Sequence, residues 1–238
     1  PRFLRQLVPI TVAGALERNR TVRITLCVAA DYLAVGSDTD FLLTPLGLDA
    51  ALIVASAFGF LLPTTKMVDA IYAHSTVRLR PQPLPASAMM RTMGYIWNHN
   101  ELVHAQRREH RVAQGVLVAG HKKDVVLTNR LWLDPNRVAI YGWHLDQHRP
   151  IQPLSTAHGL RYADYSHGVR LVSSVAYVDG EPRSLANVLH DGELGRILSD
   201  EGPIANIPGL MKALIGRAHA KLSSLANGAT QRAIDRHD

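Results

Sequence analysis

The sequence predicts an α+β fold with a mainly antiparallel central sheet flanked by N-terminal and C-terminal helices. Short apolar runs bounded by Gly, Asn and Pro dominate residues 116–178, whereas helical periodicity precedes and follows them. Strands and helices do not alternate regularly, as they would in a parallel α/β fold. Of the 238 residues, 47% are hydrophobic and 19% charged, which excludes an intrinsically disordered chain.

The first 80 residues are expected to form a hairpin, further short strands and two helices. The first two strands are rich in β-branched residues and flank a turn region at 14–19. The second helix follows Pro63 and Thr64, which are typical of a helix start. Strands are predicted at residues 8–13, 21–29, 32–35 and 77–80, and helices at 48–58 and 66–74.

A proline-rich segment, PQPLP at 81–85, follows these elements. Such a run is a stiff connector. We expect a single domain over residues 1–238, in which lobes 1–80 and 86–238 could be joined by this segment.

The rest of the chain is predicted to place strands between helices. The longest strand ends at Asp179-Gly180, a dipeptide typical of a tight turn. Helices are predicted at 95–111, 185–190, 193–198 and 208–226, and strands at 116–119, 125–128, 138–141 and 169–178.

Charge and hydropathy limit the classes of partner. Residues 78–130 hold nine Lys or Arg against three acidic residues, within a chain of net charge +6, so this stretch could attract an anionic partner. Aromatic residues make up only 6% and no nucleic-acid module is present, so no sequence-specific nucleic-acid binding is expected. The longest apolar run, 50–62, is too short to cross a membrane.

We expect an exported protein, periplasmic or extracellular, with a cytoplasmic location as the alternative; the oligomeric state is not predicted.

Reactive side chains concentrate in three segments: GHKKD (120–124), YGWH (141–144) and STAHGLRYADYSHGVR (155–170). Histidine titrates closest to neutrality and is the commonest metal ligand, so clustered histidines at strand ends indicate a site. The candidate residues are His121, Asp124, His144, His158, Asp164, Ser166 and His167.

Three chemistries fit this cluster. A metal-free site would use His158 or His167 with Asp164 as acid and base. Alternatively, Ser166 would be a nucleophile activated by a histidine from another segment. In the third chemistry zinc is bound, with the ligands His121, Asp124 and His158. We favour no cofactor, with zinc as the alternative.

Other residues of these segments are candidates for substrate contacts. One lysine of GHKKD could also be tuned as a base if it is buried. The opposing interpretation is that all these polar residues cap strands and hydrogen-bond one another. The candidate substrate-binding residues are Lys123, Trp143, His144 and Arg170.

Two short stretches are similar to motifs of bacterial cell-wall enzymes. His158-Gly159 followed by SHGVR (166–170) resembles the H-G…S-H-G-C-x-R motif of the L,D-transpeptidases. Val169 stands where that family has its nucleophilic cysteine, and Arg170 comes one residue early, so the cysteine chemistry does not carry over. Ser155, His158 and Asp164 resemble the zinc-binding S-x-H-x6-D stretch of D-alanyl-D-alanine carboxypeptidases, one residue out of register at two places.

The residues and these resemblances together predict a hydrolase. Its substrate would be a polymer of the bacterial cell envelope or an extracellular polymer, peptide or glycan, cleaved by a His/Asp/Ser site. The alternative is a non-enzymatic binding module for an anionic glycan or envelope polymer. Such a module would use the basic stretch 78–130 and the tryptophans Trp97, Trp132 and Trp143.

Overall fold

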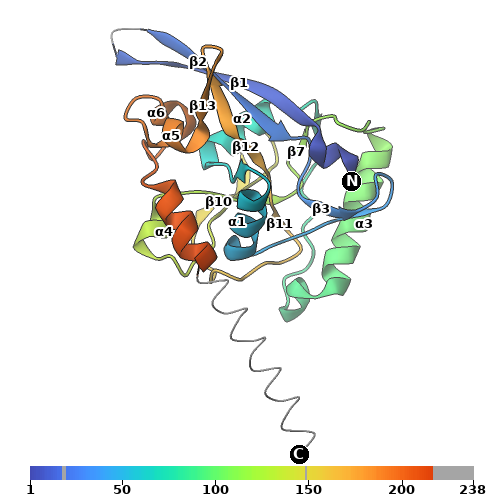
Figure 1. Ribbon diagram of the computed structural model, residues 1–238. Coiled ribbons are helices and arrows are strands. Elements are labelled where there is room, and N and C mark those ends of the chain that lie inside the picture. The colour runs from blue at the N-terminus through green and yellow to red at the C-terminus, as the bar shows by residue number, and fades with distance from the viewer. Residues whose placement is uncertain (18–19, 148, 217–238) are drawn as a thin grey trace, which may run out of the picture.

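The computed structural model describes residues 1–17, 20–147 and 149–216 (Figure 1). Its main sheet has the strand order β1-β2-β12-β13, and a short strand, β5, also pairs with β12. Every pairing in this sheet is antiparallel, which confirms the predicted α+β class with a main antiparallel sheet. The strands are β1 (Leu7–Ala15), β2 (Thr21–Ala29), β5 (Phe60–Leu61), β12 (Val172–Val178) and β13 (Glu181–Ser184).

Hydrophobic alternation explains how this sheet faces the core. In β2, the side chains of Val22, Ile24, Leu26 and Val28 are completely buried, whereas the intervening side chains are at least partly exposed. Successive residues of a strand point to opposite faces, so one face of β2 packs on the core. In Figure 1 the long β1–β2 hairpin crosses the top of the molecule, and β12 and β13 lie beside it.

A second sheet has the order β10-β9-β8-β11. Strand β11 pairs with β8 in parallel, and the other pairings are antiparallel. Two isolated pairs complete the strands, an antiparallel one (β3 with β4) and a parallel one (β6 with β7). The bounds are β3 (Ala34–Gly36), β4 (Phe41–Leu43), β6 (Val77–Arg78), β7 (Val118–Ala119), β8 (Lys123–Val125), β9 (Ile140–His144), β10 (Pro150–Ser155) and β11 (His167–Gly168).

The strands predicted over residues 116–178 are therefore divided among separate sheets, and β12 is joined to the N-terminal strands. The predicted strand 169–178 forms only from Val172 onward, as β12, because the preceding main-chain groups bond elsewhere: Leu33 N donates to Val169 O and Ala29 N donates to Leu171 O. These bonds turn the chain away from β8 and bring β12 to the N-terminal hairpin. The apolar character of Val169 and Leu171 alone gives no sign of this change of sheet.

The helices agree with the predicted positions. Thr64 and Thr92 cap α2 and α3, accepting hydrogen bonds from Met67 N and Tyr95 N. Residues 207–216 are helical, and the rest of the predicted helix 208–226 lies outside the described residues. The elements are η1 (Arg2–Arg5), α1 (Leu48–Ala57), α2 (Thr65–His74), η3 (Ala88–Arg91), α3 (Met93–Glu109), α4 (Arg130–Leu133), α5 (Leu185–His190) and α6 (Gly195–Leu198).

One buried hydrophobic cluster contains residues from both sides of the 81–85 segment. Ile10 and Leu52 come from the first 80 residues, and Val126 and Leu189 from the remainder. The two lobes considered from the sequence would therefore share this core, while the single-domain organisation stays a prediction. Across the described ranges, no helix is both long and apolar enough to span a membrane.

Candidate functional site

The second sheet brings two of the predicted reactive segments side by side. In the parallel pair of β11 with β8, His167 lies opposite Lys123 and Gly168 opposite Asp124. A Cβ atom on Gly168 would lie 2.6 Å from the Tyr32 ring and 2.7 Å from Lys122 Cβ, so a glycine is needed for this approach. The glycine of the S-H-G triplet thus has a packing reason.

Asp164 organises the turn that precedes β11. Its Oδ1 accepts hydrogen bonds from Ser166 N at 2.8 Å and from Ser166 Oγ at 2.6 Å, and its Oδ2 accepts one from Tyr162 OH at 3.0 Å. His167 N also donates to Asp164 O at 3.1 Å, which closes the turn. The chain is therefore not extended at residues 164–166, and Asp164 and Ser166 meet through a local side-chain turn.

The Asp164 carboxyl group stays ionised despite its burial. Burial alone would raise its pKa, but the nearby His167, the hydrogen bonds from Ser166 and the charge of Lys123 together lower the pKa below its usual value. The turn therefore holds a fixed negative charge at neutral pH.

His167 is the neutral member of this group. Its side chain is only 1% exposed, and neither ring nitrogen has a hydrogen-bond partner among the described residues. Burial lowers its pKa to about 4, although the Asp164 charge opposes this shift. A buried polar group without a partner is uncommon and marks a place where a ligand or water could bind.

The exposed side of the cluster is formed by residues around the Tyr162 ring. His158 is exposed and stacks on this ring, with centroids 3.9 Å apart and an interplanar angle of 10°. The Arg91 guanidinium lies 5.3 Å from the centroid of the same ring. Sequence reasoning missed Arg91 and Tyr162, although Tyr162 stands only two residues before Asp164 and could have been noticed.

The two lysines of GHKKD have different surroundings. Lys122 is 1% exposed; its Nζ donates to Tyr165 O at 2.5 Å and lies 3.2 Å from His99 Nδ1. Burial lowers the pKa of Lys122 to about 7, and the charges of Asp164 and Asp31 oppose this shift only in part. Lys123 is half-buried, with its Nζ 4.9 Å from the centroid of the Trp143 ring. Lys122 is thus buried, as a lysine that acts as a base would need to be, and Lys123 faces the exposed side of the cluster.

His121 and Asp124 belong to a separate buried network rather than to the Asp164 turn. His121 Nε2 lies 3.2 Å from Asp31 Oδ1, close enough for an ion pair but not aligned for a hydrogen bond. Tyr32 OH donates to Asp124 Oδ2 at 2.8 Å. Burial raises the pKa of Asp124 to about 6, while burial lowers that of His121.

Arg170 also serves this interior network. It is fully buried, donates to Ala29 O at 2.9 Å and to Val118 O at 2.6 Å, and lies over the Tyr32 ring. Its role as a substrate contact, predicted from the sequence, is therefore replaced by a structural one, because its guanidinium joins main-chain carbonyl groups of separate strands.

Strand β9 places His144 away from the Asp164 turn. His144 Nε2 and Asp69 Oδ1 are 2.8 Å apart, and Tyr141 OH donates to the same oxygen at 2.9 Å. Trp143 is buried and has a positive φ of 60°, which is strained for a bulky residue. The two predicted substrate contacts Trp143 and His144 therefore have different surroundings: Trp143 adjoins Lys123, whereas His144 contacts Asp69.

The features proposed for a glycan-binding module are dispersed. Trp97 and Trp132 are exposed on α3 and α4, whereas Trp143 is buried with Ile96 and Tyr165. Part of the basic stretch 78–130 points inward, since Arg107 pairs with the buried Asp31 and Lys122 is itself buried. The stretch is thus not one continuous basic surface.

The predicted zinc ligands do not come together. In the described part of the chain, no group of three or more His, Cys, Asp or Glu residues is placed to hold a metal ion. His121 faces Asp31, Asp124 bonds to Tyr32, and His158 is exposed on the Tyr162 ring.

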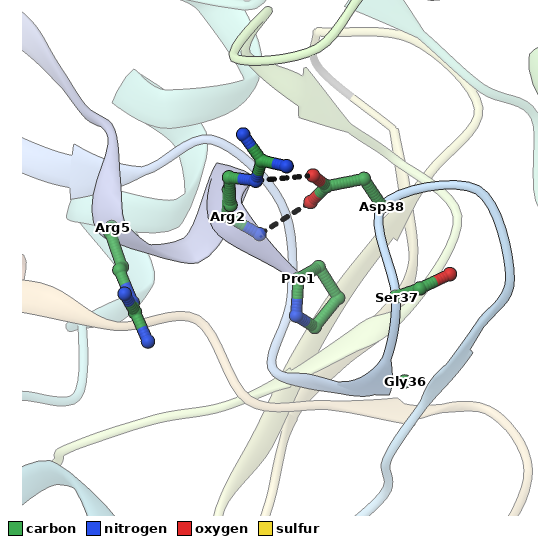
Figure 2. Close-up of a pocket in the computed structure, with 6 residues that line it drawn as sticks. All are labelled: Pro1, Arg2, Arg5, Gly36, Ser37 and Asp38. Atoms are coloured by element: carbon green, nitrogen blue, oxygen red, sulfur yellow. Dashed lines mark hydrogen bonds and ion pairs between the residues drawn. The ribbon is translucent and has the colours of Figure 1, made fainter.

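Surface pockets lie at other places on the molecule. Figure 2 shows one of about 300 Å³ between η1 and the β3–β4 turn, where Arg2 binds Asp38 through its main-chain and side-chain nitrogens. Three further pockets have volumes of about 380, 260 and 490 Å³. None of these four is lined by the predicted site residues.

Comparisons of the chain with protein-family models, with curated proteins and with solved structures give no match.

Proposed function

We propose that this protein is a hydrolase that cleaves a polymer of the bacterial cell envelope or an extracellular polymer. The observation that carries the proposal is the Asp164 turn. It holds a carboxylate, a serine hydroxyl and a neutral, unpartnered histidine within four consecutive residues. The proposal places the protein in the periplasm or outside the cell.

The composition of this turn favours an amide bond over a glycosidic bond. Glycosidases typically flank the scissile bond with two carboxyl groups. Here Asp164 is the carboxylate at the turn, and its neighbours are the serine hydroxyl and imidazole groups used in acyl transfer. The peptide component of an envelope polymer is therefore the preferred substrate.

The proton transfers follow from the charge states. Neutral His167 takes a proton from an attacking hydroxyl group as that oxygen forms a bond to the substrate carbonyl carbon. The ionised Asp164 stabilises the resulting imidazolium. His167 then returns the proton to the leaving amine as the C–N bond breaks. With water as the attacking group, these steps release both fragments. With Ser166 Oγ as the attacking group, after its hydrogen bond turns from Asp164 to His167, they leave an acyl ester on Ser166, which water then cleaves with His167 again as the base.

The second candidate function is a non-enzymatic binding module for an anionic glycan or envelope polymer. It is favoured by the basic side chains around the Tyr162 ring on the exposed side of the cluster. Such a module would retain the polymer and release no fragments.

The test is incubation of the purified protein with peptidoglycan, with mass spectrometry of released fragments and sedimentation of bound protein. We expect new amino termini, with a loss of about 10²-fold or more in His167→Gln and in Asp164→Asn. Ser166→Ala is assayed beside these two variants. Its control is Ser173→Ala, which changes a partly exposed serine on β12. Polymer that is bound but unchanged would favour the binding module, and full activity in both His167→Gln and Asp164→Asn would refute the site.

A further inference from the structure

Three basic side chains lie around the exposed side of the Asp164 turn. Arg91 reaches the Tyr162 ring from η3, His158 stacks on that ring, and Lys123 extends from β8 over Trp143. No salt bridge joins any of the three side chains to another described residue.

Several arginines elsewhere in the chain have a carboxylate partner. Arg137, Arg149 and Arg161 each pair with a carboxylate, respectively Asp134, Asp146 and Asp49. Arg91 instead keeps its N–H donors unused by described residues while its position is set by the aromatic ring. A guanidinium held this way can give two parallel hydrogen bonds to a carboxylate or phosphate.

Lys123 and His158 lie close to the same buried histidine, His167, and Arg91 lies over the Tyr162 ring beside it. The charges of Lys123 and His158 both act on His167 and lower its pKa, and the Tyr162 and His167 rings are 5.6 Å apart. The ring nitrogens of His167 are buried and unpartnered, which independently indicates a place for a ligand. The nearby Asp164 oxygens are occupied by hydroxyl and amide donors from Ser166 and Tyr162, so they are partly shielded from an incoming anion.

We propose that Arg91, Lys123 and His158 form a subsite for an anionic group of the substrate, a carboxylate or a phosphate. This inference rests on the proposed hydrolase function, and it adds the substrate class. The substrate carries a negative charge next to the bond that the Asp164 turn addresses. Tyr162 connects the two parts, since its ring faces Arg91 and His158 while its hydroxyl binds Asp164.

The test is calorimetric titration at low ionic strength with two probes, inorganic phosphate and glutarate. We expect Arg91→Gln and Lys123→Gln each to weaken binding by about tenfold, in line with the loss of one charge-assisted hydrogen bond. Arg183→Gln on β13 and Lys212→Gln in the helical residues 207–216 are matched controls, both exposed, and should bind like the unmodified protein. Far-UV circular dichroism checks that each variant is folded.

The two probes distinguish the source of the charge. If phosphate binds more tightly than glutarate and its binding depends on Arg91, the anionic group of the substrate is a phosphate. If glutarate binds more tightly than phosphate, the group is a carboxylate. Binding of neither probe by the unmodified protein, or equal binding by Arg91→Gln and Lys123→Gln, would overturn the subsite.

Hydrolysis is measured separately, so the two proposals can fail independently. Arg91-dependent anion binding without any cleavage of peptidoglycan would keep the subsite and remove the hydrolase. Cleavage that Arg91→Gln and Lys123→Gln leave unchanged, with no anion binding, would keep the hydrolase and remove the subsite.

Discussion

The pH dependence of folding stability is expected to change when Lys122 is replaced by methionine. Methionine has a similar length and no charge, so Lys122→Met removes the titrating group while filling most of its volume. The pKa of Lys122 is lowered by burial from 10.5 to about 7. Between these two pH values the unfolded chain binds more protons than the folded chain, so the stability of the unmodified protein rises with pH.

The size of the effect follows from the two pKa values. The full difference between 10.5 and about 7 corresponds to about 5 kcal/mol. Linkage gives a gain of about 2 kcal/mol between pH 7 and pH 9 and less than about 0.5 kcal/mol between pH 5 and pH 7. Lys122→Met should lack this gain. It also leaves Tyr165 O without its donor, which costs about 1–3 kcal/mol at every pH.

The assay is urea unfolding of both proteins at pH 5, 7 and 9, followed by circular dichroism. At each pH, the unfolding free energy of Lys122→Met is subtracted from that of the unmodified protein. The change of this difference with pH reports on Lys122, because the other titrating groups contribute equally to both proteins. Lys212→Met, on an exposed position, controls for the loss of a positive charge. A constant difference between the unmodified protein and Lys122→Met from pH 5 to pH 9 would refute the inference that the amine is buried and desolvated.

Three further outcomes are expected. Because burial lowers the pKa of His167 to about 4, hydrolysis should decline only as the pH falls through about 4, measured as a pH–rate profile; a decline centred near pH 6.5 would contradict the burial. The pKa of Asp124 is raised by burial from 3.8 to about 6, so stability should fall by about 3 kcal/mol as the pH rises through this range. Asp124→Asn should remove that fall, measured as the difference in unfolding free energy between pH 4 and pH 7 in urea. The same fall in Asp124→Asn as in the unmodified protein would contradict the raised pKa of Asp124. Ser166→Ala should lower the unfolding free energy by about 1–2 kcal/mol through the lost bond to Asp164, and no change would indicate that this bond is replaced by water.

Local patterns in the sequence predicted most elements. The β1–β2 hairpin, the helix cap at Thr64 and the turn at Asp179-Gly180 all occur where turn and capping residues indicated them. Asp179 and Gly180 have φ angles of 50° and 94°, as a tight turn of this class requires. Local chemistry determines these features, so a single sequence is sufficient to find them.

The distribution of strands between two sheets could not be predicted in this way. Val169, Leu171 and Val172 are apolar and buried, so hydrophobicity does not distinguish pairing with β8 from pairing with β2. The choice is made by main-chain bonds to Leu33 and Ala29, which are far away in sequence. Long-range pairing of this kind leaves no periodic signal.

The candidate site was predicted only in part, because its arrangement also depends on contacts between segments far apart in the sequence. The sequence indicated residues of the Asp164–His167 segment and of GHKKD as candidates for one site, and β11 does pair with β8. It could not assign Lys122 and Lys123 to the interior and the exposed side, because that depends on how the segment meets Tyr165 and Trp143. Arg91 joins the site from η3 only through tertiary packing.

The positive φ of Trp143 links the fold to the proposed site. Trp143 N donates to Lys122 O at 3.1 Å and its Nε1 donates to His121 O at 3.2 Å, so one residue holds the GHKKD segment at two points, through its main chain and its side chain. A backbone conformation of this kind costs about 1–3 kcal/mol, and it persists only where the surroundings offset that cost. The two hydrogen bonds and the burial of the indole ring provide that offset. The same strained residue therefore fixes Lys122 in the interior and presents its ring to Lys123, on which the proposed anion subsite depends.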